Sequence, residues 1–156
     1  MQWIMEYSKL FIPIVALLGV FIAWQQFQAN KTKLRLDLFE KRFAIYTTVI
    51  SVIDSLLFVT QEIKEEDYWR FMAAVNEAEF LLPDKVVKLL YEAKEKVHLI
   101  KIKHRALGRI ESSERDDLVA KSEEFRSELE ALESELEELS PQITDAFKSV
   151  MKFEKF

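Results

Sequence analysis

An uninterrupted apolar stretch near the N-terminus limits what this chain can fold into more than any other feature. From Leu10 to Trp24 there is no charged or strongly polar side chain, and Phe27 extends the run to about one bilayer thickness. One basic residue, Lys9, precedes the stretch. The basic residues that follow it closely are Lys31, Lys33 and Arg35. The length of the apolar run predicts a transmembrane anchor over residues 1–30. The positive-inside rule then places the N-terminus outside and the rest of the chain in the cytoplasm.

A cleaved signal peptide is the first alternative to a permanent anchor. Such a peptide needs a basic start and a small-x-small cleavage site. This chain begins Met-Gln-Trp-Ile and leaves the apolar stretch through Ala-Trp-Gln-Gln-Phe-Gln. We therefore favour a permanent anchor, and the remaining alternative is a buried helix of a soluble domain.

Small and amide side chains recur at spacings of three and four along the predicted anchor. They are Ala16, Gly19, Ala23, Gln26 and Asn30. Small residues on one face let membrane helices approach closely, and amides can hydrogen-bond between copies. This stripe predicts self-association, as a packing face or a pore lining. The alternative is that Ala and Gly are simply common in membrane helices.

Residues 31–156 are predicted to form an all-α cytoplasmic domain. The chain holds two glycines and three prolines, which leaves few sites for tight turns, and apolar residues recur at spacings of three and four. We expect one long helix over about 31–61 and a shorter one over 65–80. Two further helices, one ending at Gly108 and one at Leu139, should pair as a coiled-coil-like hairpin of an antiparallel bundle. Each has a seam of residues at spacings of three and four. The first seam is Leu90, Ala93, Val97, Ile100, His104 and Leu107, and the second is Leu118, Ser122, Phe125, Leu129, Leu132, Leu136 and Leu139. Ser140 and Pro141 are expected to start a separate last helix.

Charge is divided unevenly between the two helices of the predicted hairpin. Residues 94–109 hold six Lys or Arg and both histidines against one glutamate, whereas residues 111–138 hold twelve acids against three bases. The simplest interpretation is electrostatic pairing across the hairpin. The other is a binding site for an anion such as a phosphate or an oligonucleotide. The residues that share one stripe and could form it are Lys94, His98, Lys101 and Arg105.

The sequence offers no catalytic constellation. It has no cysteine and no glycine-rich phosphate loop, and its two histidines argue against a three-ligand zinc site. Glu95 and His98 match half of a Glu-x-x-His di-iron motif, but the second copy that such a site needs is missing. We therefore expect neither an enzyme nor a bound cofactor or metal.

Residues 34–46 read Leu-Arg-Leu-Asp-Leu-Phe-Glu-Lys-Arg-Phe-Ala-Ile-Tyr, directly after the predicted anchor, and Glu-Ala-Glu-Phe-Leu-Leu-Pro follows at 77–83. This pattern resembles a family of small, mostly uncharacterised bacterial single-pass membrane proteins, in which a membrane helix runs into a Leu-x-Leu-Asp-Leu-Phe-x-Lys-Arg-Phe-x-x-Tyr helix. Some such anchored proteins act in phage defence. The chain is similar in general plan to the oligomeric channel effector of the Hailong anti-phage system.

This resemblance implies a homo-oligomer in the bacterial inner membrane. Its cytoplasmic domain would assemble and sense an anionic ligand, such as an oligodeoxyadenylate, to open or close a pore. Because no charged or amide residue lies between Leu10 and Trp24, such a pore would gate by wetting and dewetting. The alternative is a membrane-tethered scaffold that recruits a protein partner without conducting ions.

Overall fold

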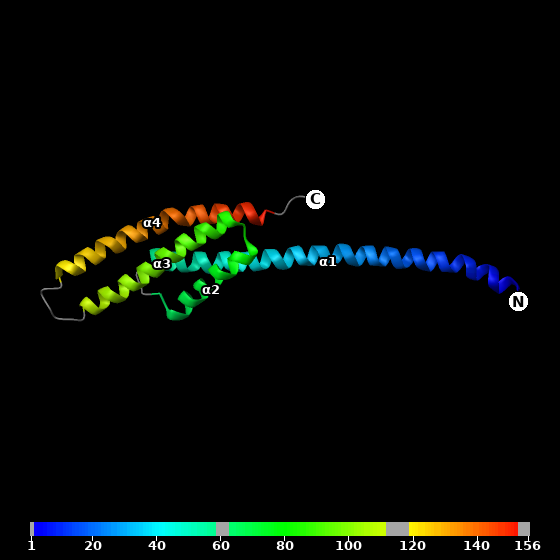
Figure 1. The fold of residues 1–156 in the computed structure, drawn as a ribbon, viewed down its shortest axis with the longest axis horizontal. Helices are drawn as coiled ribbons and strands as arrows, with labels where there is room; N and C mark the ends of the chain where they lie inside the picture. Colours follow the sequence, from blue (N-terminus) through cyan, green and yellow to red (C-terminus); the bar gives the residue numbers. More distant parts are fainter. Residues whose placement is uncertain (1, 59–62, 112–118, 153–156) are drawn as a thin grey trace. The chain divides into compact units, whose positions relative to one another are not determined.

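The computed structural model describes residues 2–58, 63–111 and 119–152. The side chains of residues 2–13, 111 and 119–120 lie outside the described set. The described residues form four helices and no strand, which confirms the all-α fold class (Figure 1). The helices are α1 (Gln2–Phe58), α2 (Glu65–Leu81), α3 (Asp84–Glu111) and α4 (Val119–Met151).

The chain divides into two compact units, Met1–Glu40 and Lys41–Phe156, and α1 runs through both. In the first unit every described side chain from Ile14 to Asp37 is exposed. The second unit contains the rest of α1 together with α2, α3 and α4. The division predicted after residue 30 falls inside the first unit.

No helix within the described residues contains a stretch that is both long enough and apolar enough to cross a membrane. The predicted anchor begins its apolar run at Leu10, and the side chains of residues 10–13 lie outside the described set.

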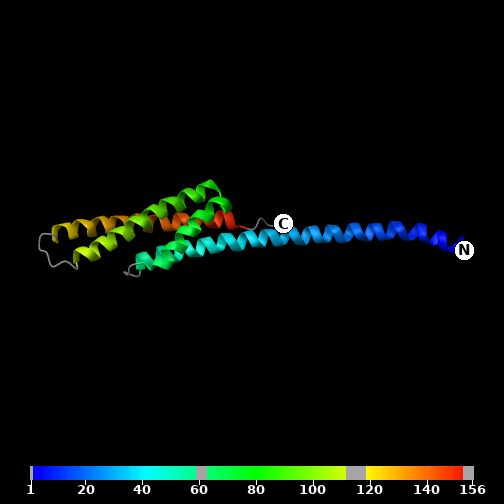
Figure 2. The same cartoon turned by 60° about the horizontal axis from the view of Figure 1, so that its bottom comes forward.

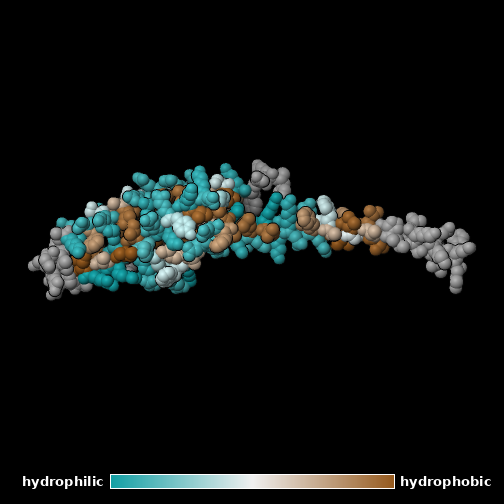
Figure 3. All heavy atoms as spheres, viewed as in Figure 1, coloured by the Kyte–Doolittle hydropathy of each residue, from teal (hydrophilic) through white to brown (hydrophobic). Residues whose placement is uncertain are grey.

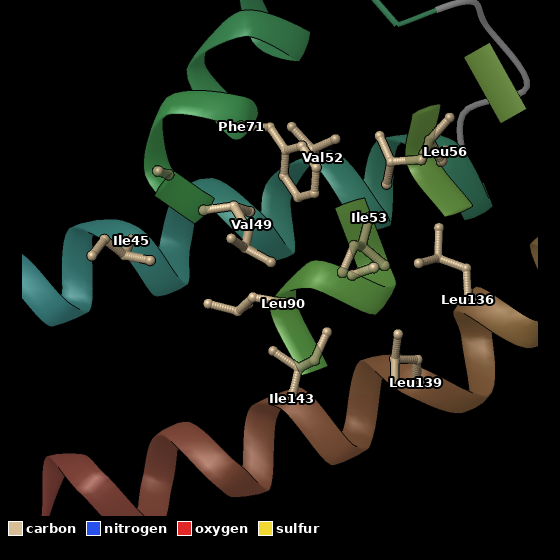
Figure 4. Close-up of a cluster of buried hydrophobic side chains, with 14 of the residues drawn as sticks. Ile45, Val49, Val52, Ile53, Leu56, Phe71, Leu90, Leu136, Leu139 and Ile143 are labelled. Carbon is tan, nitrogen blue, oxygen red and sulfur yellow. The ribbon is translucent and has the colours of Figure 1, made fainter. Parts of the chain in front are cut away.

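The second unit is built around one apolar core to which all four helices contribute. Figure 4 shows side chains of this core pointing toward one another from α1, α2, α3 and α4. The α1 residues in the core recur at spacings of three and four, because one face of a helix returns at that period. The fully buried side chains with the largest volumes are Phe71, Phe147, Ile53, Leu90, Ile100, Leu136 and Ile143.

Helices α3 and α4 pack along each other as the predicted hairpin, and both ribbon views show them side by side (Figures 1 and 2). The predicted α3 seam is confirmed where Leu90, Ala93, Val97 and Ile100 are fully buried. On α4 the buried members of the predicted seam are Leu129, Leu136 and Leu139. Helix α2 packs against the other flank of α3.

Two predicted helix ends are wrong. α4 continues through Pro141, although a proline inside a helix lacks one N–H group and costs about 3 kcal/mol. Ile143 and Phe147 lie beyond the proline and are fully buried, so their burial keeps the same face of α4 in the core and offsets that cost. α3 also passes the predicted stop at Gly108 and extends to Glu111.

The turn between α2 and α3 is fixed by a proline and by a contact from α1. α2 ends at Leu81 because Leu82 precedes Pro83 and adopts an extended backbone, with φ −122° and ψ 152°. The Nε of Arg42 donates a hydrogen bond to the Leu81 carbonyl oxygen at 2.8 Å. This contact satisfies an acceptor at the end of α2 and ties α1 to the turn within the second unit.

Candidate functional site

Helix α3 presents basic side chains on both flanks of its buried seam. One flank faces the acidic residues of α4, and three contacts cross the hairpin there. They are Lys96 with Glu135, Lys103 with Glu128, and His104 Nε2 with Glu133 Oε1 at 3.7 Å. The predicted electrostatic pairing across the hairpin is confirmed at these positions.

The four residues predicted to bind an anion lie on the other flank, which faces α2, and they do not take part in the pairing with α4 described above. Each contacts a polar residue of α2. The contacts are Lys94 Nζ with Asn76 Oδ1 at 2.8 Å, His98 Nδ1 with the Tyr68 hydroxyl at 2.6 Å, and Lys101 and Arg105 with Glu65. The structure therefore brings the predicted stripe together, and it adds partners from α2.

Glu65, the first residue of α2, receives one cation on each carboxylate oxygen. The Nζ of Lys101 lies 2.9 Å from Oε2, and the Nη2 of Arg105 lies 2.5 Å from Oε1. The side chains differ sharply in exposure, because Glu65 is 59% exposed and Arg105 50%, whereas Lys101 is 7% exposed. One partner of the cluster is therefore buried while the carboxylate that neutralises it faces water.

Lys101 is the one charged side chain among the described residues that is buried. Its Nζ lies 3.7 Å from the centroid of the Tyr68 ring, whose negative face attracts a cation by up to about 2 kcal/mol when desolvated. A buried ammonium without a partner costs several kcal/mol. Glu65 and Tyr68 together make the burial of Lys101 tolerable.

Two groups in this cluster have shifted pKa values. The hydrogen bond from Lys101 lowers the pKa of Glu65 below the usual 4.5, desolvation opposes this shift, and the charges of Lys101 and Arg105 lower the pKa further. Burial raises the pKa of the Tyr68 hydroxyl above 10.0, and the nearby charge of Glu65 raises it further. Tyr68 therefore stays protonated at neutral pH and keeps a hydroxyl beside His98.

Acid should weaken the second unit through Glu65. Because the folded-state pKa lies below the unfolded value, the ionised carboxylate stabilises the fold above about pH 4.5, and this contribution is lost as the pH falls through the folded value. We expect Glu65→Gln to unfold at a lower urea concentration than wild type near pH 7. The difference should shrink steadily below about pH 4.5, because wild type then loses the same charge.

Glu66→Gln is the matched control for this titration, because Glu66 also lies in the first turn of α2 and pairs with exposed Arg70 at 2.5 Å. Exposed i,i+4 pairs contribute about 0.3–0.5 kcal/mol, so this variant should stay close to wild type at every pH. A difference between wild type and Glu65→Gln that is constant from pH 7 to pH 3 would contradict the assignment.

We call the cluster of Glu65, Tyr68, His98, Lys101 and Arg105 the Glu65 site. Sequence reasoning found its three α3 members and missed its two α2 members. The available signal was an acid and an aromatic three residues apart at the start of an amphipathic helix. That signal was obscured because the acidic residues 111–138 offered many other partners for the same cations.

The residues of the predicted membrane-helix stripe all lie on the exposed part of α1 in the first unit. They are Ala16, Gly19, Ala23, Gln26 and Asn30. A Cβ atom placed on Gly19 meets no described atom within 4 Å. Large apolar side chains surround the stripe, among them Leu17 at 70% and Val20 at 68% exposure, and Figure 3 shows hydrophobic atoms along this segment.

The described residues contain no group of three or more His, Asp or Glu side chains that could hold a metal ion. Glu95 and His98, the half-motif for a di-iron site, lie on an α3 surface where His98 contacts Tyr68.

No family model, curated protein or solved structure matches this chain. Two surfaces of the molecule carry the function proposed below. They are the exposed apolar segment of α1 over residues 14–27, called the apolar segment below, and the Glu65 site.

Proposed function

We propose that this chain is a membrane-anchored helical protein that self-associates through α1 and acts as a channel-like effector, regulated by an anionic ligand. The observation that carries the proposal is the exposure of large apolar side chains along the apolar segment. They are Ile14, Val15, Leu17, Leu18, Val20, Phe21, Ile22, Trp24 and Phe27, each between 49% and 70% exposed. An apolar surface of this kind marks a contact with a membrane or with another protein.

A lipid environment accounts for this surface better than a groove on another protein. Val15, Leu17 and Val20 point to different sides of the helix. The face between Val15 and Val20 carries the small residues Ala16, Gly19 and Ala23, so residues 14–24 are apolar all round rather than along one stripe. Helices of this kind occur in membranes or in the interior of large proteins, whereas a helix docked in a groove keeps a polar face. The basic residues 31–35 then favour a bacterial inner-membrane protein with its second unit in the cytoplasm.

Self-association is part of the proposal because a single helix cannot enclose a pore. Gly19 lies on the exposed surface of the helix, and the stripe to which it belongs would let neighbouring copies approach closely. The resemblance of residues 34–46 to small bacterial membrane effectors motivates a role in phage defence. The basic residues of the Glu65 site motivate regulation by an anion.

Ion flux from liposomes tests the channel role. Purified full-length protein is reconstituted into vesicles loaded with K⁺, and K⁺ release is recorded. We expect wild type to conduct and the double variant Gly19→Leu, Ala23→Leu to lose roughly tenfold or more of the flux, because bulky side chains keep the helices apart. Gly108→Leu is the control, since its Cβ also meets no described atom within 4 Å and it lies outside the apolar segment.

Equal flux from the double variant and from wild type would contradict assembly on the small-residue face. Vesicles that stay silent, although the protein is inserted and phosphate has been tested, would contradict the channel role.

Silent vesicles would favour a second candidate function, a membrane-tethered scaffold that recruits a protein partner. The observation in favour of it is the exposure of large aromatic side chains on α2, where Trp69 is 64% and Phe80 85% exposed. Aromatic residues of this kind supply much of the binding energy at protein interfaces.

A further inference from the structure

The buried ammonium of Lys101 has an unusual partner for its position. Its counter-charge, Glu65, is more than half exposed and stands at the very start of α2. A carboxylate at the end of a helix can move away through side-chain rotation or fraying of the first turn. The Lys101 ammonium on α3 is only 7% exposed, so it cannot follow the Glu65 carboxylate into water without disturbing the packing around it.

We propose that Lys101 and Arg105 form a phosphate-binding site that Glu65 occupies as an internal competitor, so that a phosphate group binds when Glu65 leaves. This inference rests on the proposed function in that it specifies how an anionic ligand is recognised. It names the ligand class, a phosphate group, and the residue that regulates access to it.

The geometry of the two cations suits a phosphate group. Lys101 and Arg105 already hold two oxygens of one anionic group, at 2.9 and 2.5 Å from Nζ and Nη2. A phosphate monoester offers three acceptor oxygens and carries about −1.5 to −2 charges near pH 7, against −1 for a carboxylate. Arginine guanidinium groups bind both oxyanions in a fork, so replacing a carboxylate by a phosphate preserves the contact and strengthens the charge pairing.

Departure of Glu65 without a replacement anion is unfavourable, because Lys101 would then be buried without a full counter-charge. The site therefore holds either Glu65 or a ligand. Since Glu65 begins α2, a bound phosphate would release the start of this helix from α3.

An adjacent groove offers room for the rest of a phosphate-bearing molecule. It lies between α2 and α3 and has a volume of about 640 Å³. Its lining residues are Met72, Tyr91, Glu92, Lys94, Glu95 and His98. His98 joins the groove to the Glu65 site, because its Nδ1 shares a hydrogen bond with the Tyr68 hydroxyl, and the Tyr68 ring contacts Lys101. An organic phosphate should therefore bind more tightly than free phosphate.

Anion rescue of a variant tests the proposal. Full-length Glu65→Ala and the control Glu66→Ala are purified in detergent, and their thermal unfolding is followed with increasing sodium phosphate or phenyl phosphate, against NaCl of equal ionic strength. We expect phosphate to stabilise Glu65→Ala at concentrations at least about tenfold lower than those that affect wild type or Glu66→Ala. Phenyl phosphate should act at lower concentrations than phosphate. Adding Lys101→Met to Glu65→Ala should abolish the response.

An equal response of Glu65→Ala and Glu66→Ala would overturn the proposal, because it would show general screening. No response of Glu65→Ala, or a response that persists with Lys101→Met, would overturn it as well. If Glu65→Ala does not fold, the same titration on Glu65→Gln, which keeps the side-chain volume, decides by the same criteria. If phenyl phosphate and phosphate act equally, the groove takes no part and the ligand is free phosphate.

The outcome is independent of conduction, because binding is measured in detergent. Rescue by phosphate together with silent vesicles would support the phosphate-binding site and contradict the channel role. Ion flux without rescue by phosphate would support the channel role and contradict the phosphate-binding site.

Discussion

Replacing Phe71 with alanine should lower the free energy of unfolding of the second unit by about 3–5 kcal/mol. Phe71 lies on α2, is fully buried, and is one of the two largest fully buried side chains in the core. Its truncation removes apolar contacts and leaves a cavity between α2 and the rest of the unit, because close-packed neighbours relax only in part. Figure 4 shows it beside Val52 and Val49 of α1, so the loss should reach both helices.

Phe80→Ala is the matched control, because Phe80 lies on the same helix and is 85% exposed. An exposed substitution of this kind should change the stability by less than about 0.5 kcal/mol. The stability of both variants can be measured in the full chain from the hydrogen-exchange rates of the backbone amides of residues 86–100. These amides lie in α3, and their exchange reports on unfolding of the second unit. Similar exchange rates in Phe71→Ala and Phe80→Ala would mean that α2 is not packed as described.

The fold of the second unit could be predicted to a large extent, because apolar spacing fixes which face of each helix is buried. The α3 seam, the hairpin of α3 and α4, and the break before Pro83 all follow from local patterns. The continuation of α4 through Pro141 could not be predicted, since local rules favour a break there, and the burial of Ile143 and Phe147 beyond the proline keeps the helix intact. Tertiary packing in this case outweighs the local cost.

The candidate site could be predicted in part. The sequence places Lys94, His98, Lys101 and Arg105 on one stripe, and the structure keeps them on one flank of α3. Their contacts with α2 could not be derived, because a helical pattern gives the direction of a side chain but not the identity of the helix it faces. The burial of Lys101 is the clearest example, since charged residues are ordinarily expected on the surface.

Placing two arginines in the apolar segment should remove the protein from membranes. Leu17 and Val20 are 70% and 68% exposed and lie near the middle of the predicted span. Each arginine near the centre of a membrane helix costs about 2.5–3.5 kcal/mol for insertion. Leu17→Arg with Val20→Arg should therefore disfavour insertion by about 5–7 kcal/mol, which lowers partition on the order of a thousandfold or more.

The control is Leu34→Arg with Leu36→Arg. These leucines are 70% and 48% exposed, and they lie on the same helix beyond the apolar segment, next to Lys33 and Arg35. Two more positive charges at this position should leave insertion unchanged or favour it, because they add to the basic side of the predicted anchor.

The proposed function depends on membrane anchoring. Flotation of liposomes after an alkaline carbonate wash tests this anchoring most directly, because the wash removes proteins that are bound only at the membrane surface. Wild type and Leu34→Arg with Leu36→Arg are predicted to float with the lipid after the wash, whereas Leu17→Arg with Val20→Arg is predicted to stay at the bottom of the gradient. Wild type that is released by the wash would contradict insertion of the apolar segment.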